Sequence, residues 1–114
     1  MNDTDCVFCK IIAGDIPAEF EYESENVVAF KDIAPQAPTH ILVTPRQHLA
    51  DVTDLAAAAP DILVEMIDVA QRIADDECGG QFRLIFNTGP RAGQSVYHVH
   101  GHVIGGADLG WSPA

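Results

Sequence analysis

Three histidines fall at every second position near the C-terminal end of the chain, in the stretch YHVHGHVIGG at residues 97–106. Because side chains alternate between the two faces of a β-strand, His98, His100 and His102 share one face of the strand expected at residues 95–104. The opposite face, expected to pack toward a helix, carries Tyr97, Val99, Gly101 and Val103. A row of imidazoles is an unusual choice for a merely solvated sheet face, so the spacing indicates a functional site.

Three kinds of chemistry suit this row of imidazoles. The histidines can be structural residues held by hydrogen bonds. A histidine pair with one residue between can bind a catalytic zinc with a third ligand, leaving a position for water. Alternatively, one histidine can attack phosphorus while its neighbours orient it and bind the phosphoryl oxygens. The spacing alone does not separate the last two.

The preceding loop, GPRAGQS at residues 89–95, adds groups that suit an anion. It supplies two glycines, closely spaced backbone N–H groups and the hydroxyl of Ser95, which together can form an anion-binding concavity. The competing interpretation is a flexible connection between two strands. Asn87, at the start of the loop, can hold a ribose or a phosphate, or can simply end its strand.

Composition limits the partners. At 114 residues and 47% apolar residues, the chain is expected to form a single domain over residues 1–114. Seventeen acidic against six basic side chains give a net charge of −11. This charge opposes the phosphate contacts on which nucleic-acid affinity depends, so a DNA or RNA polymer is not expected as a partner. A small phosphate-bearing ligand remains compatible, because local donors outweigh a diffuse field at contact distance.

The chain has no signature of a membrane or secreted protein. No apolar run approaches the roughly 20 residues that span a bilayer, and the N-terminus MNDTDCVF lacks the pattern of a signal peptide. We expect a cytoplasmic protein with no membrane partner. Three cysteines are an odd number, and Cys6 and Cys9 form a C-x-x-C pair that suits a metal or redox role better than a disulfide framework. Cys78 is interpreted as an ordinary small apolar residue.

The helices and strands that must position these residues are predicted from the periodicity of apolar residues and from the glycines and prolines that end such patterns. Apolar residues recur at helical spacing in one long stretch that Gly79 and Gly80 end, and a short helix precedes Gly14. Helices are expected at residues 6–13 and 60–77, and strands at residues 19–24, 26–32, 39–45, 81–87 and 95–104. The predicted fold class is α+β: an antiparallel sheet with its helical cover on one face.

Over nearly all of its length the chain resembles the histidine-triad (HIT) family, specifically its Hint-like branch of nucleotide-binding phosphoramidases and hydrolases. The motif of alternating histidines and apolar residues is met by HVHGHVI at residues 98–104. The other similar stretches are CVFCKIIAGDIPA at 6–18, FKDIAPQAPTHILVTPRQH at 30–48 and NTGPRAGQSVYH at 87–98. The resemblance implies the HIT fold, an antiparallel sheet of about five strands with one long helix and a short N-terminal helix.

The resemblance also implies roles for individual residues. His100 would attack the α-phosphorus of a nucleoside phosphoramidate and form a nucleotidyl-imidazole intermediate that water hydrolyses, while His102 donates to a phosphate oxygen. The implied contacts to the phosphate or the leaving group are Ser95, Gln94, Gly93 and Asn87. The implied ribose contact is Asp32, and the implied base contacts are Phe8, Phe30 and Ile33. Imidazole, with a pKa near 6.5, is largely neutral and nucleophilic at pH 7.

Some HIT proteins bind a structural zinc ion, and the matching residues here are Cys6, Cys9, His48 and His98. Two cysteines and two histidines complete the closed tetrahedral shell of a structural zinc site. The alternatives for the cysteine pair are a thioredoxin-like redox role, for which the surrounding βαβ pattern is missing, and a pair of buried thiols. No organic cofactor is expected. His40 receives no role beyond a hydrogen bond.

The sequence departs from the family pattern in two places. Gly101 occupies an apolar position of the motif, which is expected to alter packing behind the histidines. In the tail, Ala107 stands where many relatives have arginine, and residues 111–114 read WSPA rather than WPPG. The tail commonly shapes substrate choice, so the leaving group stays open.

The predicted protein is a homodimeric hydrolase of purine nucleoside phosphoramidates or adenylates. The alternatives are a dinucleoside polyphosphate hydrolase and a nucleotide-binding module with little turnover. A nucleotidyltransferase is disfavoured, because Val99 and Gly101 stand where that branch has prolines.

Overall fold

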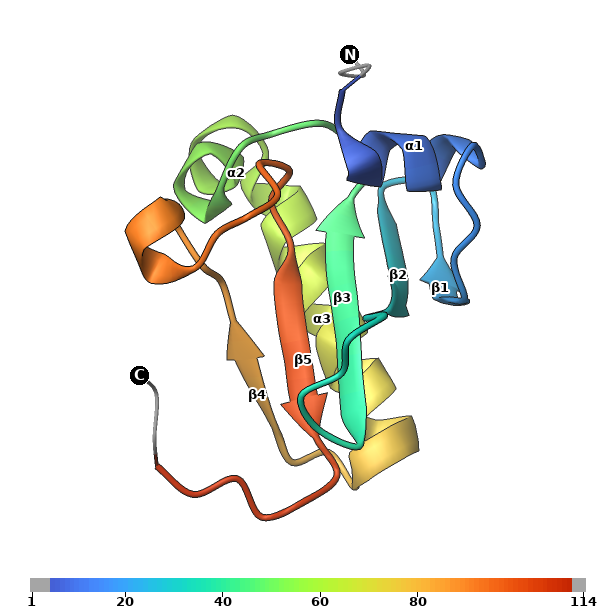
Figure 1. The fold of residues 1–114 in the computed structure, drawn as a ribbon, viewed down its shortest axis with the longest axis vertical. Coiled ribbons are helices and arrows are strands. Elements are labelled where there is room, and N and C mark those ends of the chain that lie inside the picture. The colour runs from blue at the N-terminus through green and yellow to red at the C-terminus, as the bar shows by residue number, and fades with distance from the viewer. Residues whose placement is uncertain (1–4, 112–114) are drawn as a thin grey trace.

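The computed structural model describes residues 5–111, which are arranged around one five-stranded antiparallel sheet (Figure 1). The strands are Phe20–Glu23 (β1), Val27–Lys31 (β2), Thr39–Pro45 (β3), Phe82–Ile85 (β4) and Gly101–Gly105 (β5). The helices are Val7–Ala13 (α1), Val52–Ala58 (α2) and Pro60–Cys78 (α3), with a 3-10 turn at Pro90–Ala92. The strand order β1-β2-β3-β5-β4 makes β3 the central strand and β1 and β4 the two edges. The α+β class and the antiparallel sheet are thereby confirmed.

Helix α3 runs behind the sheet and provides most of the helical side of the core (Figure 1). Pro60 occupies its first turn, where a missing N–H costs nothing, and Gly79 ends it in the left-handed conformation at φ 68°. The residues that α3 buries are Met66, Val69, Ala70, Ile73 and Ala74. They recur at the spacing of one helix face, so the sequence pattern located both the helix and its buried side.

The central strands divide the core into two clusters by their alternation. Ile41 and Val43 of β3 lie in the cluster under α3, whereas Leu42, between them, lies in a second cluster with α1. The expectation that helices cover only one face is therefore wrong. Helix α1 covers one end of the face opposite α3, because the second side of β2 and β3 is also apolar and must be buried.

The last strand begins later than its sequence predicts. Strand β5 starts at Gly101, so His98 and His100 precede it. The antiparallel register pairs Val43 with Gly101, and continuing it would set Val99 opposite Pro45. Proline has no N–H to donate, so the ladder stops there.

The segment before β5 is nevertheless held firmly in place. The N–H of Val99 donates to the carbonyl of Leu49 at 2.8 Å, and its carbonyl accepts from the Thr44 hydroxyl at 2.7 Å. Val99 and Val103 are buried in the α3 cluster as expected. Tyr97 does not join them: its side chain is 48% exposed, so the prediction that it faces the helix is wrong.

Gly101 occupies a position where the space for a side chain is already filled. A Cβ there would lie 2.9 Å from Leu84 Cδ1 and 3.0 Å from Phe86 Cζ. The departure from the motif is therefore balanced by large side chains on and after the neighbouring strand β4. The altered packing lies behind the histidines, as expected.

The sequence patterns gave no indication of helix α2. Asp51 caps it by accepting a hydrogen bond from Asp54 N–H at 2.9 Å, and Leu55 is its one buried residue. No helix within residues 5–111 is long and apolar enough to cross a membrane. Of the tail departures, Ala107 is exposed, while the last three residues of WSPA lie outside the described range.

Candidate active site

A pocket of about 580 Å³ opens between α1, the start of the β2–β3 connection and the histidine segment. Seven of the ten residues predicted to bind nucleotide line it: Phe8, Phe30, Asp32, Ile33, Ser95, His100 and His102. The pocket has an apolar end, where the ring of Phe8 lies edge-on to that of Phe30 with 5.4 Å between centroids. Its other end carries the imidazoles of His100 and His102. This division suits a ligand with a flat apolar part and a polar reacting part.

The proton of His100 can be assigned from its hydrogen bond. Its Nδ1 lies 2.8 Å from the carbonyl oxygen of His98. A carbonyl can only accept, so Nδ1 donates and the Nε2 of the neutral ring keeps its lone pair. Burial lowers the pKa of His100, opposed by the hydrogen bond to His98 and the charge of Asp32. His100 is therefore a neutral base or nucleophile, and its ring packs edge-on against Phe8 at 4.8 Å.

The proton of His102 is assigned through a chain of hydrogen bonds that begins at a backbone amide. The N–H of Gln36 donates to Nδ1 of His40 at 3.0 Å, so the proton of neutral His40 is on Nε2. That Nε2 lies 2.9 Å from Nδ1 of His102, which accepts and keeps its own proton on Nε2. Burial, and then the imidazoles of His100 and His40, lower the pKa of His102 to about 4. At pH 7 His102 is a neutral donor.

His40 and Asp32 support this arrangement from the pocket wall. Asp32 accepts from the N–H of Ala34 at 2.8 Å, and its other carboxylate oxygen lies 3.4 Å from His40 Nε2. The sequence gave His40 only a hydrogen bond, and the structure shows that this bond fixes the tautomer of His102. The available signal was an ionisable side chain in the strand THILVTP, whose other residues are apolar or threonine, since such a ring needs a partner when it is buried.

The other three predicted nucleotide contacts do not line the pocket. The side chain of Asn87 donates to the carbonyl of Ala92 at 2.9 Å, and the amide of Gln94 donates to the carbonyls of Ala50 and Val96. Gln94 also accepts from the N–H of Gly89. These side chains hold the loop in shape.

The loop amides are engaged as well. The N–H groups of Ala92, Gly93 and Gln94 donate to carbonyls of Gly89 and Pro90. These three amides therefore do not form the predicted anion-binding concavity, and Ser95 and Val96 are the residues of this segment that reach the pocket.

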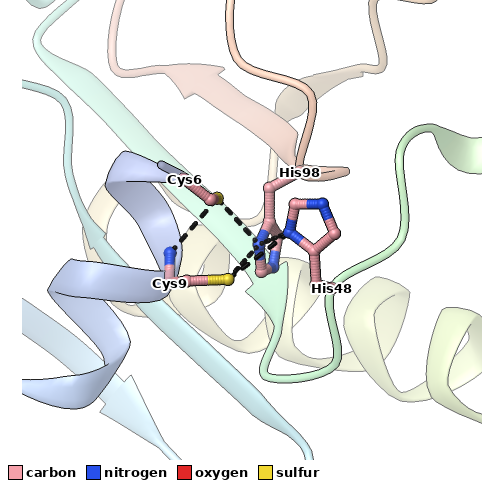
Figure 2. Close-up of side chains that lie close together, drawn as sticks. All are labelled: Cys6, Cys9, His48 and His98. Carbon is pink, nitrogen blue, oxygen red and sulfur yellow. Dashed lines mark hydrogen bonds between the residues drawn. The ribbon is translucent and has the colours of Figure 1, made fainter. Parts of the chain in front are cut away.

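Cys6, Cys9, His48 and His98 form a cluster beside the pocket (Figure 2). Both sulfurs come from the start of α1, His48 from the loop after β3 and His98 from the segment before β5. His98 is fully buried, and its Nε2 donates to the carbonyl of Pro45 at 2.7 Å, which leaves the lone pair on Nδ1. That Nδ1 lies 3.5 Å from each sulfur and 3.2 Å from Nδ1 of His48.

The cluster has the dimensions of a tetrahedral zinc shell. Zinc bonds of about 2.3 Å to sulfur and about 2.0 Å to nitrogen give tetrahedral edges of about 3.5 Å between sulfur and nitrogen and about 3.3 Å between nitrogens. The distances of 3.2–3.5 Å match these edges. Burial raises the pKa of the Cys6 thiol and lowers that of His98 to about 4, so burial here opposes the charged form of each side chain. The four residues can hold a metal ion.

Comparisons with known proteins agree with the fold. The family described as "Scavenger mRNA decapping enzyme C-term binding" matches residues 5–110. A purine nucleoside phosphoramidase of Escherichia coli is 45% identical over 106 residues, covering 91% of this chain and 89% of the relative. A HIT-like protein of Synechococcus elongatus is 43% identical over 96% of both chains. A HIT family hydrolase of Clostridium thermocellum superposes with a TM-score of 0.92 at 41% identity, covering 97% and 98% of the two chains.

Proposed function

The chain belongs to the histidine-triad (HIT) family, and we propose that it hydrolyses purine nucleoside phosphoramidates and related adenylates. The observation that carries the proposal is a pair of complementary tautomers. His100 has a lone pair on Nε2 and His102 has a proton on Nε2, and the two rings are 5.0 Å apart at the polar end of one pocket. A nucleophile beside a neutral hydrogen-bond donor is the arrangement that attack on a phosphoryl group requires.

The pocket supports one orientation of the substrate. The purine lies at the apolar end, against Phe8 and Phe30, with Ile33 beside it, where its side chain is fully exposed. The ribose hydroxyls bind the carboxylate of Asp32, which its hydrogen bond to Ala34 N–H orients. The α-phosphorus then lies at His100, within reach of the hydroxyl of Ser95.

The first step forms a bond between Nε2 of His100 and phosphorus and breaks the bond from phosphorus to the leaving nitrogen. The electron pair of the broken bond stays with the amine, which takes a proton from water. The phosphorylated ring keeps its proton on Nδ1, donated to the carbonyl of His98, so it carries a positive charge. His102 donates to a phosphoryl oxygen and stabilises the negative charge that gathers there.

The second step hydrolyses the intermediate and regenerates the free enzyme. Water attacks phosphorus, the bond to Nε2 breaks, and His100 leaves as a neutral imidazole because Nδ1 already holds its proton. The attacking water gives up one proton to solvent, which balances the proton that the amine took in the first step. The two displacements together consume one water and yield a nucleoside monophosphate and an amine.

The four-residue cluster beside the pocket supports a structural zinc site formed by Cys6, Cys9, His48 and His98. A shell of four protein ligands leaves no position for substrate, so the ion would contribute to folding and hold α1 against the histidine segment. The chemistry itself belongs to His100, which the cluster supports through the backbone of His98 and through Phe8 of α1.

We infer that the chain forms a homodimer through strand β4. Within residues 5–111, neither edge strand of the sheet, β1 or β4, pairs with a further strand on its outer side. Edge β1 reads FEYE and carries two carboxylates, which oppose pairing with a copy of itself, whereas β4 reads FRLI. Pairing two β4 edges would extend the two sheets into one.

Incubation with an adenosine phosphoramidate, an aminoacyl adenylate and a diadenosine polyphosphate tests the proposed function against its alternatives. We expect turnover of the first two, and loss of turnover in His100→Ala with an unchanged circular dichroism spectrum. Preference for the polyphosphate would favour a dinucleoside polyphosphate hydrolase. Tight binding of nucleotide with no turnover of any of the three would favour a binding module and would contradict the proposal.

A further inference from the structure

Cys6 and Cys9 are the two members of the metal cluster that can also react with each other. They lie one helical turn apart, where Cys6 caps α1 and its Sγ accepts the N–H of Cys9 at 3.3 Å. The four ligand atoms of the cluster, both sulfurs included, lie within 4.8 Å of one another (Figure 2). Both thiols are free. Two cysteines with two residues between them, at the start of a helix, have the spacing of a reactive thiol pair.

Cys6 is the cysteine that a small oxidant can reach. With His48 it lines a cavity of about 260 Å³, whereas Cys9 lines neither this cavity nor the nucleotide pocket. Water occupies about 30 Å³, and hydrogen peroxide is less than twice as large, so the cavity admits it. A thiol that coordinates a metal ion is deprotonated, and the thiolate is the form that attacks peroxide. The first sulfur to react is therefore that of Cys6, with that of Cys9 beside it.

A disulfide would connect different parts of the chain from those that zinc connects. The metal site would join α1 to His48, which is 39 residues from Cys9, and to His98, which is 92 residues from Cys6. A disulfide between Cys6 and Cys9 joins α1 only to itself. Its sulfurs are no longer thiolates and no longer bind the metal. Oxidation therefore removes both long-range connections and leaves α1 attached to the sheet through its apolar side chains.

Phe8 lies between the two cysteines and connects them to the nucleotide pocket. Its ring packs edge-on against Phe30, with 5.4 Å between centroids, and against His100 at 4.8 Å. Because Phe8 and Ile11 remain buried under apolar neighbours, α1 stays on the sheet when the metal is lost. Its position becomes less fixed, however, and Phe8 moves with it. The expected result is a weaker apolar end of the pocket, where the purine is proposed to lie.

We propose that Cys6 and Cys9 are a peroxide-sensitive modification site, at which oxidation to a disulfide releases zinc and lowers the affinity of the pocket for nucleotide. The inference rests on the structural zinc site and on the nucleotide pocket proposed above. It does not require that the protein hydrolyse a phosphoramidate.

The oxidation takes two displacements. The thiolate of Cys6 attacks one oxygen of hydrogen peroxide, so that a sulfur–oxygen bond forms, the oxygen–oxygen bond breaks and hydroxide leaves. The thiolate of Cys9 then attacks the sulfur of Cys6, so that the disulfide forms, the sulfur–oxygen bond breaks and a second hydroxide leaves. The two thiolates lose two electrons, which peroxide gains, and two protons from solvent convert both hydroxides to water.

Treatment of the zinc-loaded full chain with hydrogen peroxide tests this site. A chelating dye reports released zinc, peptide mass spectrometry reports the state of each cysteine, and titration calorimetry reports the affinity for adenosine monophosphate. We expect release of about one zinc per chain and a disulfide that joins Cys6 to Cys9. Binding of adenosine monophosphate should weaken by roughly tenfold. A reductant with added zinc should restore the starting state, because a disulfide is reversible whereas a sulfinic acid is not.

Two variants locate the reaction. Cys78→Ser removes the one cysteine outside the cluster and should respond to peroxide as the wild-type protein does. Cys6→His replaces the sulfur by a nitrogen that zinc also accepts, but it cannot form the disulfide, so it should keep its zinc in peroxide. The peptide map of the wild-type protein decides independently of this second variant.

Zinc that stays bound while Cys78 is oxidised, or a release that is lost in Cys78→Ser, overturns this inference alone. A disulfide between Cys6 and Cys9 that leaves the affinity for adenosine monophosphate unchanged overturns it as well. Reduced protein that binds no zinc contradicts the metal site, and this inference with it. No binding of adenosine monophosphate by the reduced, zinc-loaded protein contradicts the proposed function and the effect of the cysteines on the pocket.

Discussion

At the scale of single residues, the site depends on which ring nitrogen carries each proton. Three histidines that look alike in sequence have three different hydrogen-bond partners: Pro45 for His98, the backbone of His98 for His100, and His40 for His102. Each partner fixes one nitrogen and leaves the other for a ligand, a phosphorus atom or a phosphate oxygen. The roles differ because the surroundings differ.

His40 is expected to be a positioning residue for His102. His40→Ala removes the donor to Nδ1 of His102, so the ring can move its proton to Nδ1 and lose its donor toward phosphate. We expect kcat to fall by roughly ten- to a hundredfold, somewhat less than the hundred- to thousandfold loss typical of removing an oxyanion donor. The ¹⁵N chemical shifts of the His102 ring should show the change of tautomer.

The controls separate this role from a structural one. Gln71→Ala, which removes a partner of the exposed Asp75, should leave both kcat and the His102 shifts unchanged. Unaltered shifts of His102 in folded His40→Ala, or full activity, would show that His40 does not set the tautomer.

At the scale of elements, the sequence predicted the helices and strands that have a long periodic pattern of apolar residues. Strand β3 and helix α3 were located to within a residue, since both have long apolar patterns and clear breakers at their ends. The predicted start of β5 was wrong because pairing with β3 stops at Pro45. The local sequence pattern of β5 contains no information about that residue of another strand. Helix α2 was missed because one buried residue, Leu55, gives it no periodic face.

The candidate site was likewise predictable only where it does not depend on contacts between distant residues. The resemblance to the HIT family supplied His100, which lines the pocket, and the four residues of the metal cluster, which lie together once the fold is right. It did not show that Asn87 and Gln94 hold their own loop, because that depends on where the carbonyls of Ala92 and Ala50 lie. Nor did it show the exposed position of Tyr97.

Helix α1 connects the metal cluster to the nucleotide pocket. Its seven residues are too few for a stable isolated helix, and they carry both Cys9 and Phe8, which packs on His100. We expect about one zinc per chain in protein purified without added metal. Cys9→Ser should lose the zinc and weaken binding of adenosine monophosphate by roughly tenfold, about 1.4 kcal/mol, while the sheet stays folded.

Elemental analysis and titration calorimetry measure both effects. Cys78→Ser, which alters the one cysteine outside the cluster, is the matched control and should keep zinc and affinity. Less than about a quarter of an equivalent of zinc in wild-type protein, with no chelator used, would refute the site. Unchanged affinity in zinc-free Cys9→Ser would show that α1 is held without the metal.

At the scale of the whole molecule, a net charge of −11 surrounds a pocket proposed to bind an anion. Binding must then come from short-range contacts, since at a few ångströms local donors outweigh the diffuse field. In the proposed mechanism the Nε2 proton of neutral His102 is such a donor, and it does not depend on a basic surface. The same surface disfavours polymeric nucleic acids.

Assembly is the second property at this scale. Sedimentation should give a mass twice the 12.3 kDa of one chain. Ile85→Lys places a charge on edge β4 and should shift the protein toward the monomer, because lysine on an edge opposes strand pairing. Glu23→Lys, the equivalent change on edge β1, should leave the dimer intact. A mass of 12.3 kDa at every concentration, or a dimer broken only by the β1 variant, would contradict pairing through β4.

The attack of His100 on phosphorus is tested most directly by trapping the covalent intermediate. Wild-type protein is mixed with an adenosine phosphoramidate, quenched during turnover at neutral or alkaline pH, where phosphorylated histidine survives, and analysed by peptide mass spectrometry. We predict one nucleotidyl group on His100, formed and lost at rates at least equal to kcat, and no such group in His100→Ala. Turnover without this adduct, an adduct on another residue, or more than a few per cent of activity in His100→Ala would contradict the mechanism.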